Sequence, residues 1–389
     1  MPPAIRVLHV SAAGVYGGNE EHLRTLFTHT DPARVETHLA APPRSALFRK
    51  ALDLGIQAHP LVIRGGADLP AAFRLMRILQ RVQPDLLHTH NRWEDALAFL
   101  LKAFLGNLCW VTTLHDHLNM DQQGVRVRTL KGRLYCRMLR RADLVMANAR
   151  ATAADAREEA RLDPAKVLAI TNGQDLSRLE GVAAAPALLA RGLVTPDRGD
   201  RIACRVGLFA RLRGRAVQKK GIPEFLEAAA QVLRGGLDAS FTVVGADAAA
   251  EAEMDRLAGR GVFLVDTWKV IPFTEDARPL MKGCDIVVCP SRFEGLPRAL
   301  MEAMGLGCAV IGTRVDGIGE IIEHEVSGLL VPPRDPQALA DAIRRLAGDP
   351  ALRERLGAAA ARRVREHYGA ARMAREHEEA YQRLYSTRP

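Results

Sequence analysis

Residues 290–304, PSRFEGLPRALMEAM, join a short apolar run to a helical pattern, and this junction is the clearest clue to the architecture of the chain. The run before it, 286–288, predicts a buried strand, and the apolar spacing over 296–304 predicts a helix. The residues between them would form a tight polar turn. In parallel α/β sheets, ligands bind beyond the carboxyl ends of strands, so this turn is a candidate binding loop.

Two glutamates stand out here. Glu294 and Glu302 are eight residues apart, just over two helical turns. On one helix face they would lie about 12 Å apart by helical rise, which suits binding two hydroxyl-bearing parts of one ligand. That separation is too large for two carboxyl groups that share a proton. Glu302 also lies among Leu300, Ala303 and Met304, where a carboxylate would need a partner.

The same alternation of strand and helix extends outward in both directions. Further strands are predicted at 5–10, 37–40, 85–88, 110–114, 144–147, 167–171, 206–209, 241–244, 262–265 and 309–311. Helices are predicted at 20–30, 73–81, 96–105, 223–233 and 336–346, and across 351–384 with a break near Tyr368 and Gly369. Strands that alternate with helices indicate parallel sheets covered on both faces.

The length of 389 residues favours two domains. Residues 181–200, rich in Ala, Gly and Pro, interrupt the alternation and are predicted to link them. We therefore expect an α/β protein with two Rossmann-like domains, the first over 1–180 and the second over 201–368.

Two groups of residues could contact phosphate. The turn 14–20, GVYGGNE, lies between the first strand and the first helix, where glycines let the backbone approach an anion. It does not match G-x-G-x-x-G, so a structural tight turn is almost as good an explanation. Arg211 and Lys220 follow the first strand of the second half and could together neutralise a diphosphate. The alternative for the second group is a solvated basic loop, which Arg213 and Arg215 fit.

Histidines also follow two predicted strands, as His88-Thr89-His90 and His115-Asp116-His117. Histidine at a strand end can bind substrate or transfer protons. We expect a functional position for His115, and hydrogen-bonded structural positions for His88 and His117. No metal site is predicted, because no carboxylate can be identified that would orient a ligating histidine.

The composition of the chain limits the classes of ligand that it is expected to bind. A net charge of +9 favours anionic ligands, but only 5% of residues are aromatic and no RNA-recognition or zinc-finger pattern occurs, so nucleic acid is not expected. No apolar run approaches the roughly 20 residues of a membrane span, and no secretory signal is visible. The six scattered cysteines fit free thiols in a reducing cytoplasm.

Two basic and partly apolar stretches, 73–81 and 126–141, have the pattern of helices that lie on an anionic bilayer. The same pattern describes an ordinary helix whose apolar face packs on a sheet, and the two alternatives stay open. A peripheral location on the inner face of the cell membrane is thus one expectation beside a purely cytoplasmic one.

Residues 291–331 resemble the C-terminal signature of glycosyltransferase family 4, retaining enzymes of the GT-B fold. Glu294 and Glu302 match its E-x7-E motif. Gly17, Gly18 and Glu20 match its G-G-x-E, 172–175 its N-G-x-D turn, and Arg211 with 220–221 its phosphate-binding pair. The resemblance implies two Rossmann-like domains that face each other across a cleft, with a C-terminal helix, 369–389, that returns to the acceptor-binding first domain.

The resemblance also implies a role for each matching residue. Catalytic positions would be His115 near the reacting sugar, Glu294 on its hydroxyls, and Arg211 and Lys220 on the leaving diphosphate. The donor would further contact Gly17, Gly18, Gly295, Leu296 and, at its ribose, Glu302. The family needs no metal and no cofactor, because cationic side chains take the place of the ion.

The chain departs from the family pattern at two points. Many members have E-G-F-G-L-P, whereas here Glu294 is followed by Gly-Leu-Pro, and Pro297 has no N–H to offer a sugar. Asp247 stands where a second glycine is often found. Both departures concern the identity of the donor more than the fold.

The predicted function is transfer of a hexosyl group from a nucleotide diphosphate sugar to an acceptor hydroxyl, in bacterial surface glycan or glycolipid synthesis. Acceptor contacts are expected on loops of the first domain, at 44–50, 65–70 and 119–128. The alternatives are a nucleotide-sugar epimerase or a phosphorylase of the same fold, and a non-catalytic protein that binds anionic surfaces.

Overall fold

The computed structural model describes residues 4–12, 17–118, 129–185, 204–213, 216–258 and 268–387. They form two compact units, each presented by itself below. The described part of the first unit comprises residues 4–12, 17–118, 129–173 and 369–387, and that of the second lies within 174–368. Most of the predicted linker, the predicted loop at 119–128 and the predicted strand at 262–265 lie outside the described residues.

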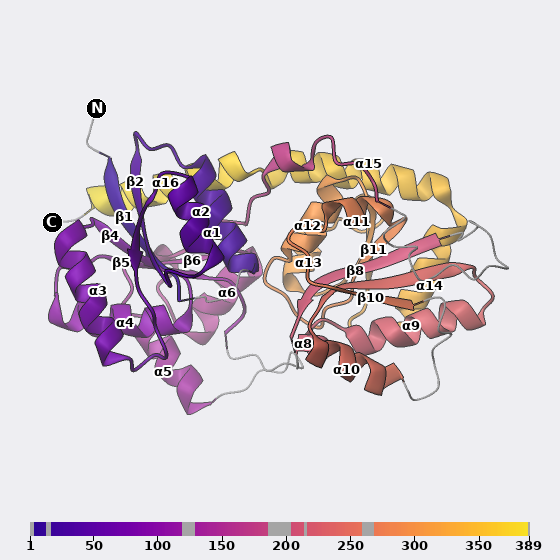
Figure 1. Cartoon of the computed structure of the whole chain (residues 1–389), viewed down its shortest axis with the longest axis horizontal. Coiled ribbons are helices and arrows are strands. Elements are labelled where there is room, and N and C mark those ends of the chain that lie inside the picture. Colours follow the sequence, from indigo (N-terminus) through magenta and orange to yellow (C-terminus); the bar gives the residue numbers. More distant parts are fainter. Residues whose placement is uncertain are drawn as a thin grey trace. The chain divides into compact units, whose positions relative to one another are not determined.

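The first unit contains a sheet of seven parallel strands in the order β3-β2-β1-β4-β5-β6-β7 (Figure 1). The strands are β1 (Ile5–Val10), β2 (Val35–Ala41), β3 (Gln57–Pro60), β4 (Leu86–Thr89), β5 (Trp110–Leu114), β6 (Leu144–Ala147) and β7 (Val167–Ala169). The helices are α1 (Gly18–His29), α2 (Ala46–Asp53), α3 (Leu69–Val82), α4 (Arg92–Phe104), α5 (Leu130–Leu139), α6 (Arg150–Glu159) and α16 (Ala370–Ser386).

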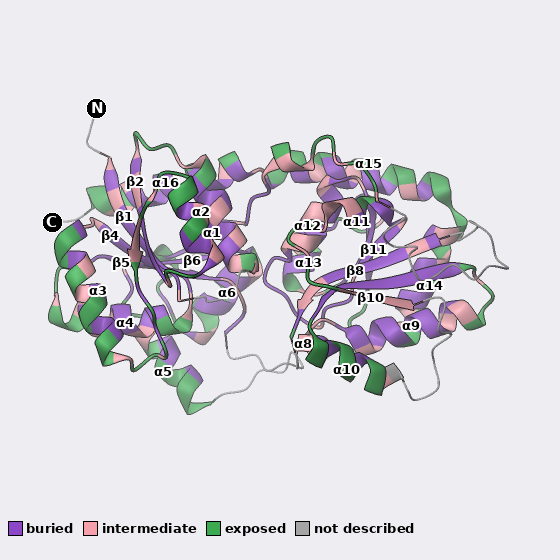
Figure 2. Cartoon of the chain, in the orientation of Figure 1, coloured by how far each residue is buried: buried purple, intermediate pink, exposed green. Residues whose placement is uncertain are grey.

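Apolar side chains fill both faces of this sheet. One core lies under α1, α2 and α16, and the other lies under α3 to α6. In Figure 2 the central strands are mostly buried, while the helices turn exposed residues outward; the edge strand β3 has no buried residue. Near-continuous apolar strands are what a parallel sheet covered on both faces requires.

The second unit repeats this plan with six parallel strands in the order β10-β9-β8-β11-β12-β13. They are β8 (Cys204–Leu212), β9 (Ala239–Ala246), β10 (Trp268–Pro272), β11 (Ile286–Cys289), β12 (Ala309–Thr313) and β13 (Leu329–Val331). Its helices are α8 (Ala216–Lys219), α9 (Ile222–Arg234), α10 (Ala248–Ala258), α11 (Arg278–Gly283), α12 (Arg298–Gly305), α13 (Asp316–Ile321), α14 (Pro336–Gly348) and α15 (Pro350–His367). The prediction of two Rossmann-like α/β domains is confirmed.

In each sheet the order of strands reverses once. In the first sheet, β2 and β3 follow on one side of β1, and β4 then pairs with the other side of β1. In the second sheet, β9 and β10 follow on one side of β8, and β11 pairs with its other side. Such switch points open a crevice at the carboxyl ends of the strands, where ligands bind. His88 and His90, at the end of β4, and the loop after β11 lie at these positions.

The segment 44–50 was predicted as a loop, and this is wrong. Ser45 caps α2 there, its hydroxyl accepting a hydrogen bond from the backbone N–H of Phe48, and Leu47, Phe48 and Ala51 are buried. The helix has only eight residues. Eight residues make only about two helical turns, which is too few for the spacing of apolar residues to distinguish a helix from a loop.

The first unit ends at Gly173, so residues 174–180 group with the second unit and not with the first. The reason is a short 3₁₀ helix, Leu176–Leu179, which packs on α12. A Cβ atom built at Gly305 of α12 would lie 2.4 Å from the Leu179 side chain. The contact of Leu179 is therefore made with the core of the second unit.

The chain returns to the first unit at its C-terminal end, after the predicted break between α15 and α16. Glu378 of α16 accepts hydrogen bonds from the Arg34 guanidinium, at 2.7 Å, and from the backbone N–H of Asp31, at 2.9 Å. The Tyr381 side chain is buried against the sheet. Among the described helices, none combines the length and apolar character needed to cross a membrane.

Candidate functional site

In the second unit, the predicted binding loop runs from β11 to α12, and Glu294 lies at its centre. Glu294 is buried, and its Oε1 accepts a hydrogen bond from the Ser291 hydroxyl at 3.1 Å. The same oxygen is in direct contact with the Lys220 ammonium group. The structure therefore brings together two of the predicted site residues, which are 74 positions apart.

Charge keeps Glu294 ionised. Burial alone would raise its pKa, but the positive charges of Lys220 and Lys219 and the hydrogen bonds to its carboxylate hold that pKa below its usual value. A buried carboxylate that stays ionised can accept hydrogen bonds from hydroxyl groups of a ligand.

The prediction that Glu294 and Glu302 lie on one helix face, about 12 Å apart, is wrong. The helix α12 begins at Arg298 with Pro297 as its N-cap, so Glu294 lies in the loop and not on the helix. Glu302 is on α12 and is partly buried. Its predicted contact with a ribose stays a prediction.

A glycine makes the Lys220–Glu294 contact geometrically feasible. Gly221 has a left-handed backbone, with φ of +68°, and a Cβ atom there would lie 1.9 Å from the carbonyl oxygen of Pro290. The backbone N–H of Arg292 donates to the carbonyl of Lys219 at 2.9 Å, and its guanidinium pairs with Glu224 at 2.8 Å. These contacts hold residues 219–221 against the binding loop between β11 and α12.

A second close approach supports the other side of the loop. Gly317, in the first turn of α13, has its Cα so near the loop that an added Cβ would lie 1.2 Å from the carbonyl oxygen of Gly295. The Thr313 hydroxyl also donates to the carbonyl of Ser291. Gly295 and Leu296, both predicted donor contacts, are buried within this support.

Arg211 lies near the end of β8, and its guanidinium carbon is 4.6 Å from the centre of the Phe273 ring. Sequence reasoning missed Phe273, since a single aromatic residue after an edge strand carries no recognisable pattern. Stacking on an aromatic ring limits the conformations of the arginine side chain. Asp247, at the position of an expected glycine, accepts a hydrogen bond from the N–H of Ala250 and so stabilises the start of α10.

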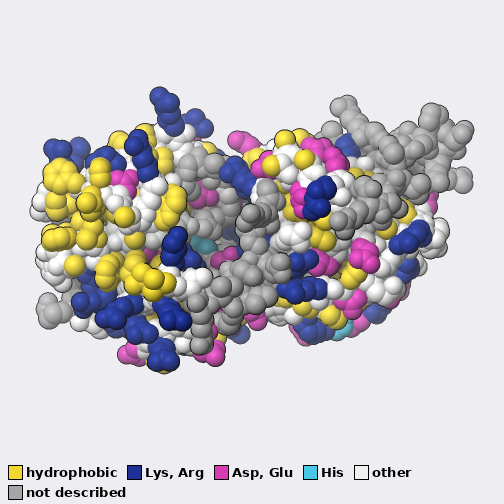
Figure 3. All heavy atoms as spheres, turned by 90° about the horizontal axis from the view of Figure 1, so that it is seen from below, with side chains coloured by type: hydrophobic (Ala, Val, Ile, Leu, Met, Phe, Trp, Pro, Cys, Tyr) yellow, Lys and Arg dark blue, Asp and Glu magenta, His cyan; other side chains and the backbone are white. Residues whose placement is uncertain are grey.

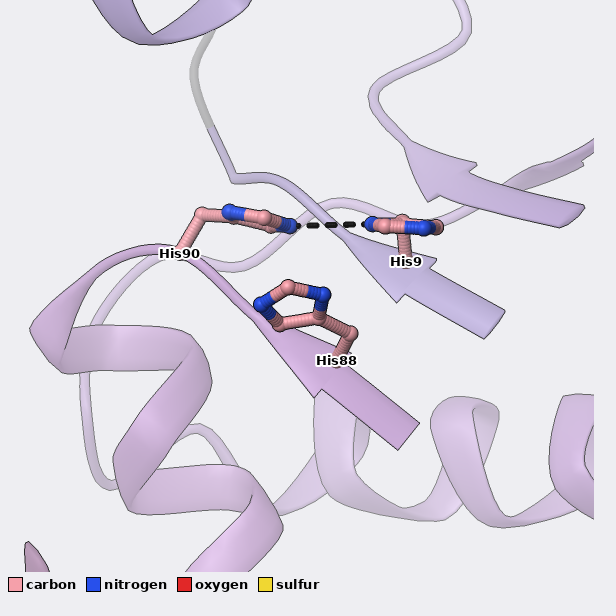
Figure 4. A group of neighbouring side chains, drawn as sticks. All are labelled: His9, His88 and His90. Atoms are coloured by element: carbon pink, nitrogen blue, oxygen red, sulfur yellow. Dashed lines mark hydrogen bonds between the residues drawn. The ribbon is translucent and has the colours of Figure 1, made fainter. Parts of the chain in front are cut away.

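In the first unit, six histidines gather at the carboxyl edge of the sheet. Figure 4 shows three of them, His9 on β1 and His88 and His90 from β4 and the turn after it. His9 Nδ1 and His90 Nε2 are 3.0 Å apart. The rings of the other three contact this group or one another, and they belong to His22, His115 and His377.

His88 is hydrogen-bonded on both ring nitrogens, to the Tyr381 hydroxyl at 2.7 Å and the Thr113 hydroxyl at 2.8 Å. It is thus a structural residue, in agreement with the prediction. His117 lies 3.7 Å from the carboxylate of Asp155. The His115 ring lies edge-on to His22, with the ring centres 5.1 Å apart, and borders the pocket described next.

Nitrogens of His9, His88 and His90 all lie within 4.8 Å of one another, a spacing that a metal ion could bridge. However, both ring nitrogens of His88 are already hydrogen-bonded to the hydroxyls of Tyr381 and Thr113, and His9 is hydrogen-bonded to His90. Metal binding would have to displace these hydrogen bonds. The arrangement therefore fits a buried hydrogen-bonded network better than an ion site.

Beside the histidines, a cavity of about 610 Å³ opens at the same edge of the sheet. The residues that line it are Ala12, Asn19, His90, Asn91, Arg92, Trp93, Glu94, Thr113, Leu114, His115, Asp116, His117, Leu118 and Tyr135. Gly17, the N-cap of α1, and Gly18, its first residue, lie at this edge too. Their predicted contact with phosphate stays a prediction, and 14–16 lie outside the described residues.

Burial keeps the histidines neutral. It lowers the pKa of His9 to about 3 and that of His377 to about 4, and it holds the pKa of His88 and His90 well below the usual value. Neighbouring histidines add to the effect, because a second positive charge in the cluster would be repelled.

We expect the chain to lose stability as the pH falls below about 6.5. The unfolded chain binds protons at these histidines from their ordinary pKa of 6.5 downward, whereas folded His9 and His377 resist protonation down to about 3 and about 4. Each pH unit in that window costs about 1.4 kcal/mol per histidine. Glu94, whose pKa burial raises to about 7, and Asp95 act in the opposite direction and offset part of the loss.

Thermal unfolding measured from neutral to mildly acidic pH, at constant ionic strength, checks this. His377→Gln should flatten the dependence, whereas His367→Gln, at an exposed position, should leave it unchanged. A melting temperature that does not fall on acidification would contradict the expectation.

Comparison with known proteins gives a consistent result. A family model described as Glycosyltransferase Family 4 matches residues 16–178, and one described as Glycosyl transferases group 1 matches 204–349. The alpha-D-kanosaminyltransferase of Streptomyces kanamyceticus is 36% identical over 151 residues, so the match spans only 38% of that relative's length and 38% of this chain. The UDP-Gal:alpha-D-GlcNAc-diphosphoundecaprenol alpha-1,3-galactosyltransferase of Escherichia coli is 23% identical over 73% of this chain and 72% of its own.

Among solved structures, Anabaena Alr3699/HepE in complex with UDP and glucose superimposes with a TM-score of 0.79. The alignment covers 97% of this chain and 100% of that one at 21% identity. At this level of identity the likeness shows that the two chains share a fold.

Proposed function

This chain belongs to the family 4 glycosyltransferases, and from that premise we propose that it transfers a hexosyl group from a nucleotide diphosphate sugar to an acceptor hydroxyl, with retention of configuration. The observation that carries the proposal is the contact between Lys220 and the buried, ionised Glu294 at the switch point of the second sheet. A fixed cation beside a hydroxyl-binding carboxylate suits a ligand that joins a diphosphate to a sugar.

In the proposed reaction, the bond from the anomeric carbon to the diphosphate oxygen breaks and a bond to the acceptor oxygen forms on the same face. The acceptor proton passes to the departing diphosphate. Lys220 and Arg211 stabilise the charge that develops on the leaving group, and Glu294 orients the sugar by its hydroxyls. His115 would lie near the reacting sugar and Glu302 at the ribose.

The test is a screen of UDP-, GDP- and ADP-sugars by thermal shift, since a ligand that binds the folded state raises the melting temperature. NMR of the product then reports the configuration of the new glycosidic bond. A glycoside with the donor's configuration supports the proposal. An epimerised sugar nucleotide or a sugar phosphate would instead indicate one of the alternative enzymes, and binding of neither donor nor product nucleotide would indicate a non-catalytic protein.

We expect transfer to continue in the presence of EDTA, because Arg211 and Lys220 supply the positive charge that a divalent cation gives other enzymes. The measurement is initial rate before and after chelation, with metal content of the protein determined in parallel. Activity that disappears and returns with magnesium or manganese would refute metal independence. Activity that returns only with zinc would point to the histidine cluster.

The proposal includes a peripheral position on the cytoplasmic face of the membrane, where surface glycans and glycolipids are made. Part of the basic helix α5 packs conventionally, since Tyr135 and Leu139 are buried. However, Leu130 and Leu134, one turn apart, are 73% and 54% exposed. Figure 3 shows hydrophobic and basic side chains side by side on this part of the first unit.

Helix α3 adds to the same surface, because α4 contacts both α3 and α5. The exposed apolar residues of α3 and α4 are Leu69, Phe73, Trp93 and Phe104, and the exposed cations on α3 and α5 include Arg74, Arg77, Arg81, Lys131, Arg133 and Arg137. Apolar side chains interleaved with cations suit an anionic bilayer. The Escherichia coli relative acts on a sugar carried by diphosphoundecaprenol, and a lipid-linked acceptor here would explain such a surface.

We expect the protein to sediment with vesicles that contain anionic lipid, and binding to weaken as salt rises, because each cation near the surface contributes about 1 kcal/mol. Neutralising Lys131 and Arg133 should reduce binding. Neutralising Arg362 and Arg365, two exposed cations on α15 of the second unit, is the matched control. Equal loss in both variants, or no binding at all, would leave a cytoplasmic enzyme with a soluble acceptor.

A further inference from the structure

Along the described residues, the chain passes between the two units at two points, and the second unit is closed by a hydrogen bond between them. The described part of this unit begins at Gln174 and ends at Tyr368. The backbone N–H of Gln174 donates to the carbonyl oxygen of Tyr368 at 2.7 Å, and both side chains are buried. Buried polar side chains need hydrogen-bond partners, and the partners of these two lead to the binding loop between β11 and α12.

The side chain of Gln174 holds the end of the loop that continues into α12. Its amide nitrogen donates to the carbonyl oxygen of Arg298 at 3.3 Å. Arg298 is the first residue of α12 and directly follows Pro297, the N-cap. At the other end of α12, the Leu179 side chain packs so close to Gly305 that a Cβ atom there would lie 2.4 Å away. The segment from Gln174 to Leu179 therefore contacts both ends of this helix.

The hydroxyl group of Tyr368 holds α13, the helix that supports the centre of the loop. It donates to the carbonyl oxygen of Glu320 at 2.8 Å. The Arg363 guanidinium donates to the carbonyl oxygens of Glu320 and Ile321, at 3.2 and 2.7 Å. Both carbonyl groups belong to the last turn of α13, where hydrogen-bond donors must come from outside the helix. Tyr368 and Arg363 supply these donors and so fix the position of α13.

Helix α13 connects Tyr368 to the centre of the loop. A Cβ atom at Gly317, in its first turn, would lie 1.2 Å from the carbonyl oxygen of Gly295 and 3.1 Å from that of Glu294. The helix has only six residues, about 9 Å of helical rise, so its two ends move together. The loop cannot move toward α13, and α13 cannot move away while Tyr368 and Arg363 hold its last turn.

We infer that Gln174 and Tyr368 are positioning residues for the donor, which hold the binding loop in its ligand-binding conformation from the two points where the chain leaves the second unit. They act through Arg298 and through α13. The inference rests on the proposed glycosyl transfer and adds to it two residues outside the loop. When the loop spends less time in the binding conformation, the apparent dissociation constant rises by the factor by which that population falls.

Hydrogen exchange measured by mass spectrometry on the full-length protein, without ligand, tests the hold on the loop. Gln174→Met and Tyr368→Phe remove the polar atoms and keep most of the side-chain volume. Each should speed exchange of the backbone amides of 291–296 about threefold or more, because loss of a hydrogen bond changes a local opening equilibrium by that order. The amides of β9, in the same unit, are the internal reference and should be unchanged. Gln337→Met and Tyr385→Phe, the same changes at exposed positions, are the matched controls.

Nucleotide binding and kinetics test whether this hold acts on the donor. With UDP, GDP and ADP as probes, each variant should raise the dissociation constant of the nucleotide that binds the parent protein, and the KM for the matching donor, about threefold or more. The kcat at saturating donor should stay within about twofold of the parent value, because bound donor restores the loop conformation. A merely structural role would lower kcat through loss of folded protein and leave KM unchanged.

The inference is overturned if neither variant speeds exchange in the loop, or if exchange in β9 rises equally. It is also overturned if kcat falls while KM and the nucleotide dissociation constant stay at the parent values. Failure of the proposed function is a separate result, since the parent protein would then bind none of UDP, GDP and ADP. Faster loop exchange in the Gln174 and Tyr368 variants would still support their hold on the loop in that case.

Discussion

Replacing Lys220 with alanine should lower turnover at least about tenfold and weaken binding of the product nucleotide, because a charge-assisted hydrogen bond contributes about 1.5–3 kcal/mol. The change also leaves the buried Glu294 without its cation. Burial then dominates, and the pKa of Glu294 should rise above its usual value. The variant therefore loses both the diphosphate contact and the ionised carboxylate.

Steady-state kinetics and nucleotide titration calorimetry measure these losses. Lys220→Arg keeps the charge and should retain more activity than Lys220→Ala. The double variant with Glu294→Gln should lose less than the sum of the two single variants, because each single change already disrupts the same contact. A folded Lys220→Ala protein with unchanged kcat/KM would exclude Lys220 from the site.

Replacing Gly317 with alanine should reduce kcat/KM by about a hundredfold or more, since small displacements of a positioned group have effects of that size. The new Cβ atom would lie 1.2 Å from the carbonyl oxygen of Gly295, so the loop must move away from α13. The displacement takes with it Glu294, which directly precedes Gly295 in the loop. Donor binding should fall with activity.

Gly319→Ala is the matched control for this prediction. It makes the same change in the same helix, but nothing lies within 4 Å of the added atom. Alanine favours a helix over glycine, so this variant should be at least as stable as the parent protein and fully active. Equal kinetics for the two variants would show that the close approach of Gly317 to Gly295 is not needed.

Most strands and long helices could be predicted because they carry their own periodic pattern. The strands β1, β5 and β6 have the predicted bounds, and the break between α15 and α16 falls at Tyr368 and Gly369 as expected. Elements with too few residues to establish a period were missed, such as α2 and the edge strand β3. Their identity depends on what they pack against.

Some residues of the candidate site could likewise be identified from the sequence, and others could not. Motif spacing identified Lys220 and Glu294 separately, and the strand ends identified the histidine pairs. Phe273, His9, His22 and His377 carry no motif, and sequence reasoning did not find them. Their proximity to Arg211 or to the histidine cluster follows only from the order of strands and the return of α16.

The amino-acid sequence by itself determined the two α/β units, because hydrophobic periodicity is a local property. The tertiary structure alone decided that Glu294 meets Lys220 and stays ionised, and that burial lowers the pKa of His9, His88, His90 and His377. Ionisation depends on burial and on neighbouring charges. Both are supplied by residues that are distant along the chain and adjacent only after folding.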